Sequence, residues 1–226
     1  MPIKKVNTSA SSRSSYRRCE MQPQWLTWAK EIQMISQAGL AYSENPFDLE
    51  RYRKLQSIAA EILATHSDVN FSVLHSLLES EVGYTTPKID VRGLIILEGR
   101  VLLVQEKLDG NRWTLPGGWA DVNESPSEAV SREVYEETGY SCRASRLLAV
   151  YDRNKHPHPP TLWHTYKLFF LCEITGGEPK SSLETGITAC FAPDMLPELS
   201  VARVTYSQID RLLYLASQPQ MPTDFD

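Results

Sequence analysis

The first clear pattern along the chain is an apolar stripe at helical spacing that starts near residue 25. Residues 25–41 place apolar side chains three or four positions apart, and Asn45-Pro46 then interrupts the pattern. A second stripe follows, and Asp68 is suited to cap a third, shorter helix. The apolar positions are Trp25, Trp28, Ala29, Ile32 and Ile35, then Leu49, Tyr52, Leu55, Ala59, Ile62 and Leu63, then Leu74, Leu77 and Leu78. Residues 22–86 are therefore predicted to form a small all-helical domain that packs on its neighbour or on a second subunit.

From Pro87 onward the pattern changes to short β-branched and apolar runs, which are typical of strands. KIDVRGLIILE and RVLLVQEK flank a Glu98-Gly99 turn, and RLLAVYD, LWHTYKLFFLCEI and ITACFA follow later. The last predicted element is an amphipathic helix over TYSQIDRLLYLAS. Its residues expected in the core are Ile209, Leu212, Leu213 and Leu215. Strands, one inserted helix, more strands and a final helix predict an α/β sandwich around a mixed sheet over residues 87–226.

The inserted helix has sequence signals at both of its ends. Ser125 can cap it, Pro126 takes the first helical position, and Glu128 completes a capping box. Gly139 stands just past the last turn, where a left-handed residue is favoured. The side facing the sheet is expected to consist of Ala129, Val130 and Val134.

The other side of this helix is crowded with carboxylates. Glu133 and Glu137 lie one turn apart and Glu136 lies beside them, so their charges repel one another. A solvated helix face is one explanation. A bound divalent cation is the other, because Mg²⁺ prefers oxygen ligands and the Gly117-Gly118 pair before the helix lets backbone approach a ligand closely.

Composition narrows the classes of partner. The chain of 226 residues has a formal charge of −5, which argues against nucleic acid or an anionic membrane surface as its partner. No apolar run approaches the roughly 18–20 residues of a membrane-spanning helix. The four cysteines lie far apart and form no metal-binding pattern. We therefore expect reduced thiols in a cytoplasmic protein without membrane contact.

Residues 1–21 differ from the rest of the chain. The first twenty hold five basic residues against Glu20, a net charge of +4 that leaves −9 for the remainder. A disordered tail, a transit peptide and translation from Met21 are three explanations. A disordered basic tail without a function of its own is the preferred interpretation.

The carboxylate helix and the loop before it match the signature of the Nudix hydrolases. The matching positions are Gly118, Glu124, Arg132, Glu133, Val134, Glu136, Glu137, Gly139 and Tyr140. The strand pattern extends the resemblance over residues 87–217, which implies the Nudix αβα sandwich. The helical N-terminus followed by YTTPKIDVRG also resembles the nucleoside-diphosphate-X pyrophosphatase subgroup, and within it most closely the CDP-choline pyrophosphatases.

The resemblance implies a role for each matching residue. The implied ligands of Mg²⁺, with Mn²⁺ as a substitute, are Glu133, Glu136, Glu137 and the carbonyl of Gly117. Arg132 would orient these glutamates, and the surrounding loop would be supported by Gly118, Glu124 and Gly139. The general base would be Glu133 or Glu184, which lies in the loop SSLETG.

Substrate contacts are harder to assign from sequence. Of the aromatic candidates Trp113, Trp119, Tyr151 and Trp163, Trp119 is preferred for stacking because it follows the double glycine. Arg92 and Lys107 are candidate phosphate partners, and His156 and His158 in the stiff HPHPP loop could reach a leaving group. The plain alternatives are a core aromatic, a surface cation and a rigid turn.

The implied reaction is Mg²⁺-dependent hydrolysis of a nucleoside diphosphate linked to X, giving a nucleoside monophosphate and X-phosphate. CDP-choline is the first substrate expected and ADP-ribose the second. A Nudix-derived ligand-sensing regulator and an RNA-end-processing hydrolase are the alternatives. Residues 22–86 carry a net charge of −4, whereas a DNA-binding helix pair needs a basic face. These helices are expected to form a homodimer or to cover the active site.

Overall fold

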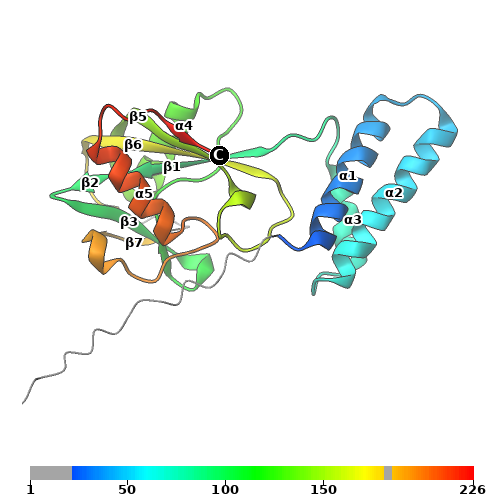
Figure 1. The fold of residues 1–226 in the computed structure, drawn as a ribbon, viewed down its shortest axis with the longest axis horizontal. Coiled ribbons are helices and arrows are strands. Elements are labelled where there is room, and N and C mark those ends of the chain that lie inside the picture. The colour runs from blue at the N-terminus through cyan, green and yellow to red at the C-terminus, as the bar shows by residue number, and fades with distance from the viewer. Residues whose placement is uncertain (1–21, 181–184) are drawn as a thin grey trace, which may run out of the picture.

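The computed structural model describes residues 22–180 and 185–226. A helical part and a larger sheet part stand side by side, joined by the chain segment that enters strand β1 (Figure 1). The predictions for residues 1–21 and for Glu184 lie outside the described residues. Among the described residues, no helix is both long and apolar enough to cross a membrane.

The helical part consists of α1 (Gln24–Tyr42), α2 (Pro46–Thr65) and α3 (Phe71–Ser80). Its core is built largely from alanine and leucine, which lets α1 and α2 approach closely. The buried residues are Leu26, Ala29, Ala59, Ala60, Leu63, Leu74 and Leu78. The prediction that Asp68 caps the third helix is wrong, because α3 begins at Phe71 and Asn70 accepts a hydrogen bond from the Ser72 N–H at 2.8 Å.

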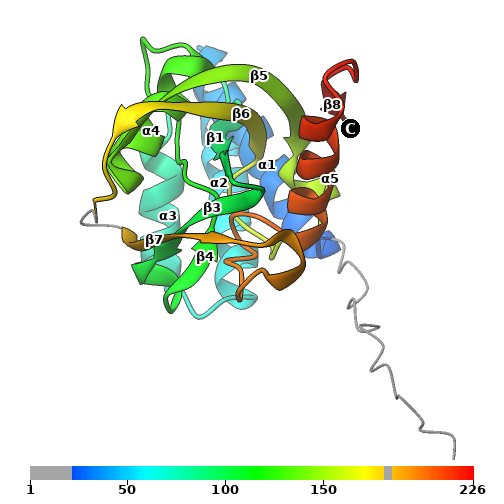
Figure 2. The same ribbon diagram turned by 90° about the vertical axis from the view of Figure 1, so that its left-hand side faces the viewer.

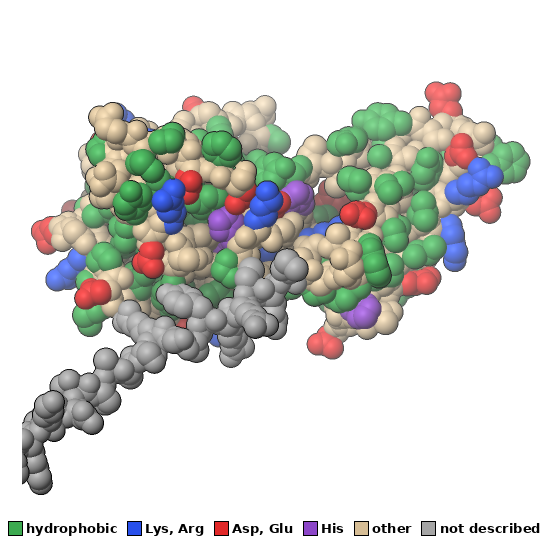
Figure 3. Space-filling model, in the orientation of Figure 1, with side chains coloured by type: hydrophobic (Ala, Val, Ile, Leu, Met, Phe, Trp, Pro, Cys, Tyr) green, Lys and Arg blue, Asp and Glu red, His purple; other side chains and the backbone are tan. Residues whose placement is uncertain are grey.

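The apolar stripe predicted for the first helix is only partly buried. Trp28 and Ile35 are 55% and 50% exposed, whereas Gln33 and Gln37 on the same helix are buried. The Gln33 amide donates to the Leu78 carbonyl at 3.4 Å, so the side facing α3 is partly polar. The alanine-lined contact with α2 leaves Trp28 and Ile35 outside, and hydrophobic side chains are visible over the helical part in Figure 3.

The strands of the sheet part form two four-stranded groups. One has the order β1-β6-β5-β8, with β1 parallel to β6 and β5 antiparallel to β6. The other pairs β3 with β2, β4 and β7. The strands are β1 (Lys88–Leu94), β2 (Ile96–Leu97), β3 (Arg100–Glu106), β4 (Arg112–Thr114), β5 (Tyr140–Asp152), β6 (Thr165–Gly177), β7 (Thr185–Phe191) and β8 (Asp224–Phe225). The predicted hairpin is present, with Glu98 and Gly99 both at positive φ between β2 and β3.

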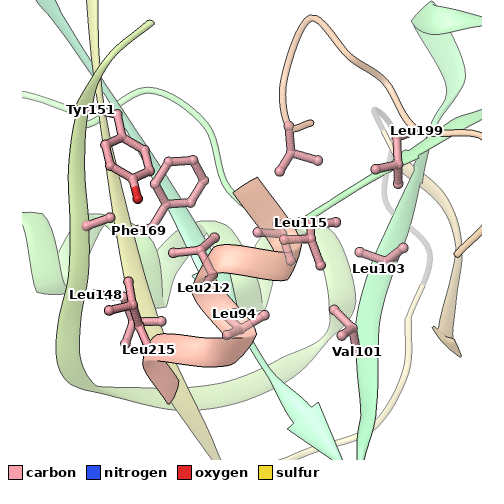
Figure 4. Close-up of a cluster of buried hydrophobic side chains, with 13 residues drawn as sticks. Leu94, Val101, Leu103, Leu115, Leu148, Tyr151, Phe169, Leu199, Leu212 and Leu215 are labelled. Atoms are coloured by element: carbon pink, nitrogen blue, oxygen red, sulfur yellow. The ribbon is translucent and has the colours of Figure 1, made fainter. Parts of the chain in front are cut away.

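Two helices cover opposite sides of these strands, as Figure 2 shows: α4 (Pro126–Thr138) and α5 (Tyr206–Ser217). One apolar cluster packs Ile209, Leu212 and Leu215 of α5 against the strands (Figure 4). The other packs Ala129, Val130 and Val134 of α4 against β1 and β6. The predicted α/β sandwich with an N-terminal helical part is therefore confirmed.

Strand β8 has no signal in the sequence, because it is only two residues long. It pairs in parallel with β5, and the Tyr151 hydroxyl donates to the Asp224 carboxylate at 2.7 Å. Arg211 of α5 donates to the same carboxylate at 2.8 Å. These contacts attach the C-terminal segment to the edge of the sheet.

Leu212 tests the packing of α5. Its side chain is fully buried, so Leu212→Ala should lower the free energy of unfolding by about 2–5 kcal/mol through lost apolar burial and a residual cavity. Urea unfolding followed by circular dichroism measures this change. Tyr214→Ala on the 50% exposed side of the same helix is the control, and equal losses in both variants would contradict the assigned packing.

Candidate active site

Helix α4 carries the crowded glutamates, and its ends are fixed as its sequence predicts. The Ser125 hydroxyl accepts from the Glu128 N–H and the Glu128 carboxylate accepts from the Ser125 N–H, so the capping box is present. Gly139 follows the helix at φ 80°. The apolar side of α4 packs against the strands, and of its glutamates Glu137 is buried, Glu133 is partly buried and Glu136 is exposed.

Arg132 links these carboxylates to the loop before the helix. Its guanidinium donates to Glu124 at 2.7 Å, to Glu133 at 2.8 Å and to Glu136 at 3.2 Å. Another N–H reaches the Trp119 carbonyl at 3.2 Å. The hydrogen bond from Arg132 lowers the pKa of Glu124 to about 2, so this carboxylate is ionised when it holds the loop. Arg132 therefore offsets part of the repulsion among the glutamates.

The two glycines before α4 lie close to other parts of the site, and Gly117 is packed too tightly to carry a side chain. Gly117 has φ 142°, and a Cβ there would overlap the Val91 carbonyl oxygen. Its N–H donates to Glu137 at 2.8 Å. A Cβ on Gly118 would lie 2.8 Å from a carboxylate oxygen of Glu133. The double glycine thus lets backbone contact Glu137 and lets the carboxylate of Glu133 lie where a side chain on Gly118 would begin.

Burial changes the acidity of the two inner glutamates. It raises the pKa of Glu137 to about 7, although the positive charge of Arg92 acts in the opposite direction. Burial likewise raises the pKa of Glu133, against the hydrogen bond from Arg132. A buried carboxylate with a raised pKa gains from any cation placed beside it, so these side chains suit a metal ion.

The donor set fits a hard divalent cation, although the side chains are not gathered into a finished cage. Within residues 22–180 and 185–226, no three His, Cys, Asp or Glu side chains stand close enough together to hold an ion. Arg132 and the Gly117 N–H occupy carboxylate oxygens that an ion would use. Backbone N–H groups of β1 bind the carbonyls of Pro116 and Gly118. Among the described residues none donates to the carbonyl of Gly117, which leaves that oxygen for a cation.

The glutamates border a cavity of about 950 Å³. One side is acidic and comes from α4, through Glu133, Glu136 and Glu137. Other parts of the lining are basic and come from β1, β6 and the segments after β5 and before α5. These basic residues are Arg92, Lys167, Arg153 and Arg203. The cavity therefore combines a surface for a metal ion with a surface for an anion.

Several charged lining residues were not predicted from the sequence, among them Lys167, Asp90 and Glu106 as well as Arg153 and Arg203. Lys167 is 1% exposed near the start of β6, Asp90 is 6% exposed in β1, and Glu106 is 5% exposed at the end of β3. Glu106 pairs with Arg203 at 2.9 Å. For Lys167, a charged residue within an apolar strand pattern was the available signal, because such a residue is seldom buried without a partner.

The structure brings only some of the predicted substrate contacts to the cavity. Arg92 and Trp119 line it, and so does Trp163, whereas Trp113 and Tyr151 belong to the apolar core. Within the described residues, Glu124, Lys107, His156 and His158 do not line the cavity. The roles predicted for Lys107 and the two histidines therefore stay predictions without support from their position.

His158 is buried behind the basic lining. Its Nδ1 lies 2.7 Å from the Val201 carbonyl, so Nδ1 carries the proton and donates it. Burial lowers the pKa of His158 to about 3, and the positive charges of Lys167 and Arg153 act in the same direction. The imidazole is therefore neutral near pH 7 and adds no further positive charge to the site.

Both parts of the chain match models of known protein families. Residues 87–212, more than half of the chain, match the family model described as NUDIX domain. The chain belongs to the Nudix family. Residues 23–78 of this Nudix hydrolase match a second model, described as UDP-X-like, N-terminal oligomerisation domain.

Two relatives of this Nudix hydrolase match most of its length, and a third matches a shorter part. It is 44% identical over 207 residues to a Bacillus subtilis (strain 168) protein named "Putative ADP-ribose pyrophosphatase YjhB", covering 92% of this chain and 99% of the relative. The crystal structure of a UDP-X diphosphatase is 32% identical with a TM-score of 0.59, covering 89% and 98%. An ADP-ribose pyrophosphatase from Streptococcus suis 89-1591 is 38% identical with a TM-score of 0.58, covering 62% and 100%.

The burial of His158 predicts a pH dependence of stability. A histidine whose pKa is lowered on folding stabilises the protein above its unfolded pKa and loses that contribution as the pH falls. Between pH 7 and pH 4 the wild type should lose roughly 3 kcal/mol relative to His158→Asn, whose amide can keep the donor but cannot titrate. Urea unfolding at several pH values measures the difference. His75→Asn on α3 is the control, and a pH-independent difference for His158→Asn would refute the assignment.

Proposed function

We propose that this Nudix hydrolase cleaves the diphosphate bond of a nucleoside diphosphate linked to X, yielding a nucleoside monophosphate and X-phosphate. The observation that carries the proposal is the cavity in which the glutamates of α4, with Glu137 buried, meet the buried cations of β1 and β6. A diphosphate is the ligand that uses both, because it binds metal and basic groups at once. The cavity volume of about 950 Å³ suits a nucleotide-sized ligand.

A divalent cation, Mg²⁺ first and Mn²⁺ as a substitute, would be held by Glu133, Glu136, Glu137 and the carbonyl of Gly117. When bound, such an ion neutralises diphosphate charge and lowers the pKa of the attacking water. The chain itself supplies orientation, because Arg132 holds Glu133 and Glu136 from one side. Glu133 and Glu184 remain the proposed general bases.

The names of the relatives indicate which substrates to assay first. Two of them are named for ADP-ribose and one for UDP-linked substrates, which supports ADP-ribose and UDP-sugars as the first compounds to assay. CDP-choline remains a candidate from the sequence resemblance. Trp119 is 50% exposed at the edge of the cavity, where an aromatic ring is accessible for stacking on a base.

A phosphate-release screen tests the reaction. With Mg²⁺ the wild type should cleave ADP-ribose, a UDP-sugar or CDP-choline faster than nucleoside triphosphates or capped RNA. Glu137→Gln should lower turnover by at least about 100-fold, because it removes one charge from the metal site. It should also lose the increase in melting temperature that Mg²⁺ gives the wild type.

The matched control is Glu173→Gln, an exposed glutamate of β6 whose carboxylate pairs with Arg143. It should retain wild-type turnover and the Mg²⁺ response. Cleavage of triphosphates alone would contradict the proposed reaction, and near-normal turnover in Glu137→Gln would contradict the metal assignment.

We also propose that the helical part forms a homodimer interface. Trp28, Ile35 and Tyr42 recur every seven residues along α1 and are 55%, 50% and 71% exposed. A heptad stripe of this kind packs well against a second helix. The family description of residues 23–78 as an oligomerisation domain supports the same assignment.

Multi-angle light scattering tests this interface. The full chain should elute as a dimer, and Trp28→Glu with Ile35→Glu should shift it to a monomer because two charges are placed in an apolar contact. The double variant Val73→Glu, Leu77→Glu on α3 is the control that keeps the dimer. A monomeric wild type would rule the interface out.

A further inference from the structure

Three charged residues are buried side by side on the two parallel strands that border the cavity. Asp90 of β1 stands opposite Lys167 of β6 in the strand register. Its carboxylate accepts from Lys167 at 2.6 Å and from two guanidinium nitrogens of Arg92 at 2.8 and 2.9 Å. The residues are 6%, 1% and 4% exposed, so all three charges are removed from bulk water.

The charges in this cluster do not balance. On the two strands themselves one carboxylate pairs with the two cations Arg92 and Lys167, and a third cation, Arg153, is 8% exposed. The carboxylates of Glu133 and Glu137 on α4 also act on Arg92, but among the described residues Lys167 and Arg153 are left without a second carboxylate. Arg153 donates to the Ala202 carbonyl at 3.3 Å, which supplies no negative charge. Burial, with Arg92 and Arg153 acting in the same direction, lowers the pKa of Lys167 to about 8. Excess buried charge of one sign is unfavourable unless a counter-ion is supplied.

The unbalanced cations still have hydrogen atoms to donate. A lysine ammonium has three N–H donors, and among the described residues the Lys167 ammonium donates to Asp90 alone. Arg92 uses one N–H on the Leu115 carbonyl and two on Asp90, out of five. Asp90, Arg92 and Lys167 all line the cavity that Glu133 and Glu137 also border.

We propose that Lys167 and Arg92, positioned by Asp90, bind the second phosphate of the diphosphate substrate, the one farther from the glutamates of α4. This inference rests on the proposed function, because it divides one diphosphate between an acidic metal surface and a basic surface. Asp90 is a positioning residue: it orients both cations toward the cavity and offsets part of their charge. The phosphate supplies the remaining counter-charge.

A binding experiment without metal separates this inference from catalysis. Isothermal titration calorimetry with inorganic pyrophosphate in metal-free buffer uses the full chain. Lys167→Met should raise the Kd for pyrophosphate at least about tenfold, the loss expected for one charge-assisted hydrogen bond. Arg143→Met, which removes an exposed cation of β5, should bind as the wild type does. Melting temperatures verify that each variant is folded, and Lys167→Gln replaces Lys167→Met if the latter fails to fold.

Asp90→Asn provides the second measurement. Its carboxylate raises the pKa of Lys167, so its loss should move the alkaline decline of pyrophosphate binding to lower pH by about one unit. A merely structural role would weaken binding equally at every pH. The other titratable and charged groups facing Lys167 are Arg92 from β1, Tyr151 from β5, Arg153 from the turn after β5, and His158.

The outcomes are distinct from those of the activity screen. Pyrophosphate binding that depends on Lys167, in a protein that cleaves no diphosphate, would retain the anion site and reject the proposed reaction. Diphosphate cleavage with unchanged pyrophosphate binding in Lys167→Met would reject the anion site alone. Absence of saturable pyrophosphate binding by the wild type would also overturn it.

Discussion

The arrangement of the cavity depends on the buried ion pairs that Asp90 makes with Arg92 and Lys167. These pairs place positive charge inside the sheet, where an isolated cation would be strongly disfavoured. The charge of Arg92 also affects the glutamates on the other side of the cavity. Burial raises the pKa values of Glu133 and Glu137, and the positive charge of Arg92 opposes that rise. The acidic and basic surfaces are therefore electrostatically coupled before any ligand enters. A metal ion and a diphosphate would complete a balance that the protein leaves open.

The segment between β5 and β6 joins this cavity to the rest of the chain. Leu162 packs against the core of the helical part, while its neighbours Thr161 and Trp163 line the cavity. At the start of the segment, His156 lies 3.1 Å from the carboxylate of Asp226 at the C-terminus. Lys30 of α1 also lies close to this segment. Burial lowers the pKa of Lys30 to about 8, and the positive charge of Arg153 acts in the same direction. The helical part thus contacts a segment that shapes the site, which is compatible with a covering role as well as an interface.

The acidic half of the site could be predicted because its determinants are local. Spacing along one helix decides which glutamates share a face, and the capping box and Gly139 define where that helix begins and ends. Of the basic half only Arg92 was a candidate from the sequence. Its cluster with Asp90 and Lys167 could not be predicted, because Asp90 and Lys167 are 77 residues apart and meet only through the parallel pairing of β1 with β6. For the same reason the sequence did not show which apolar residues of α1 are covered by the rest of the chain, and only the packing shows that Trp28 stays outside.

The sequence by itself determined the family, the α/β class and the carboxylate helix, since each depends on short-range periodicity or on fixed spacing within a few turns. Tertiary structure alone decided which cations face those glutamates, which histidine is buried, and where the C-terminal strand attaches. Those outcomes require segments distant in sequence to be brought together by the sheet. A pattern within one segment carries no information about its neighbour across a strand pair, so the second surface of the cavity became visible only in the fold.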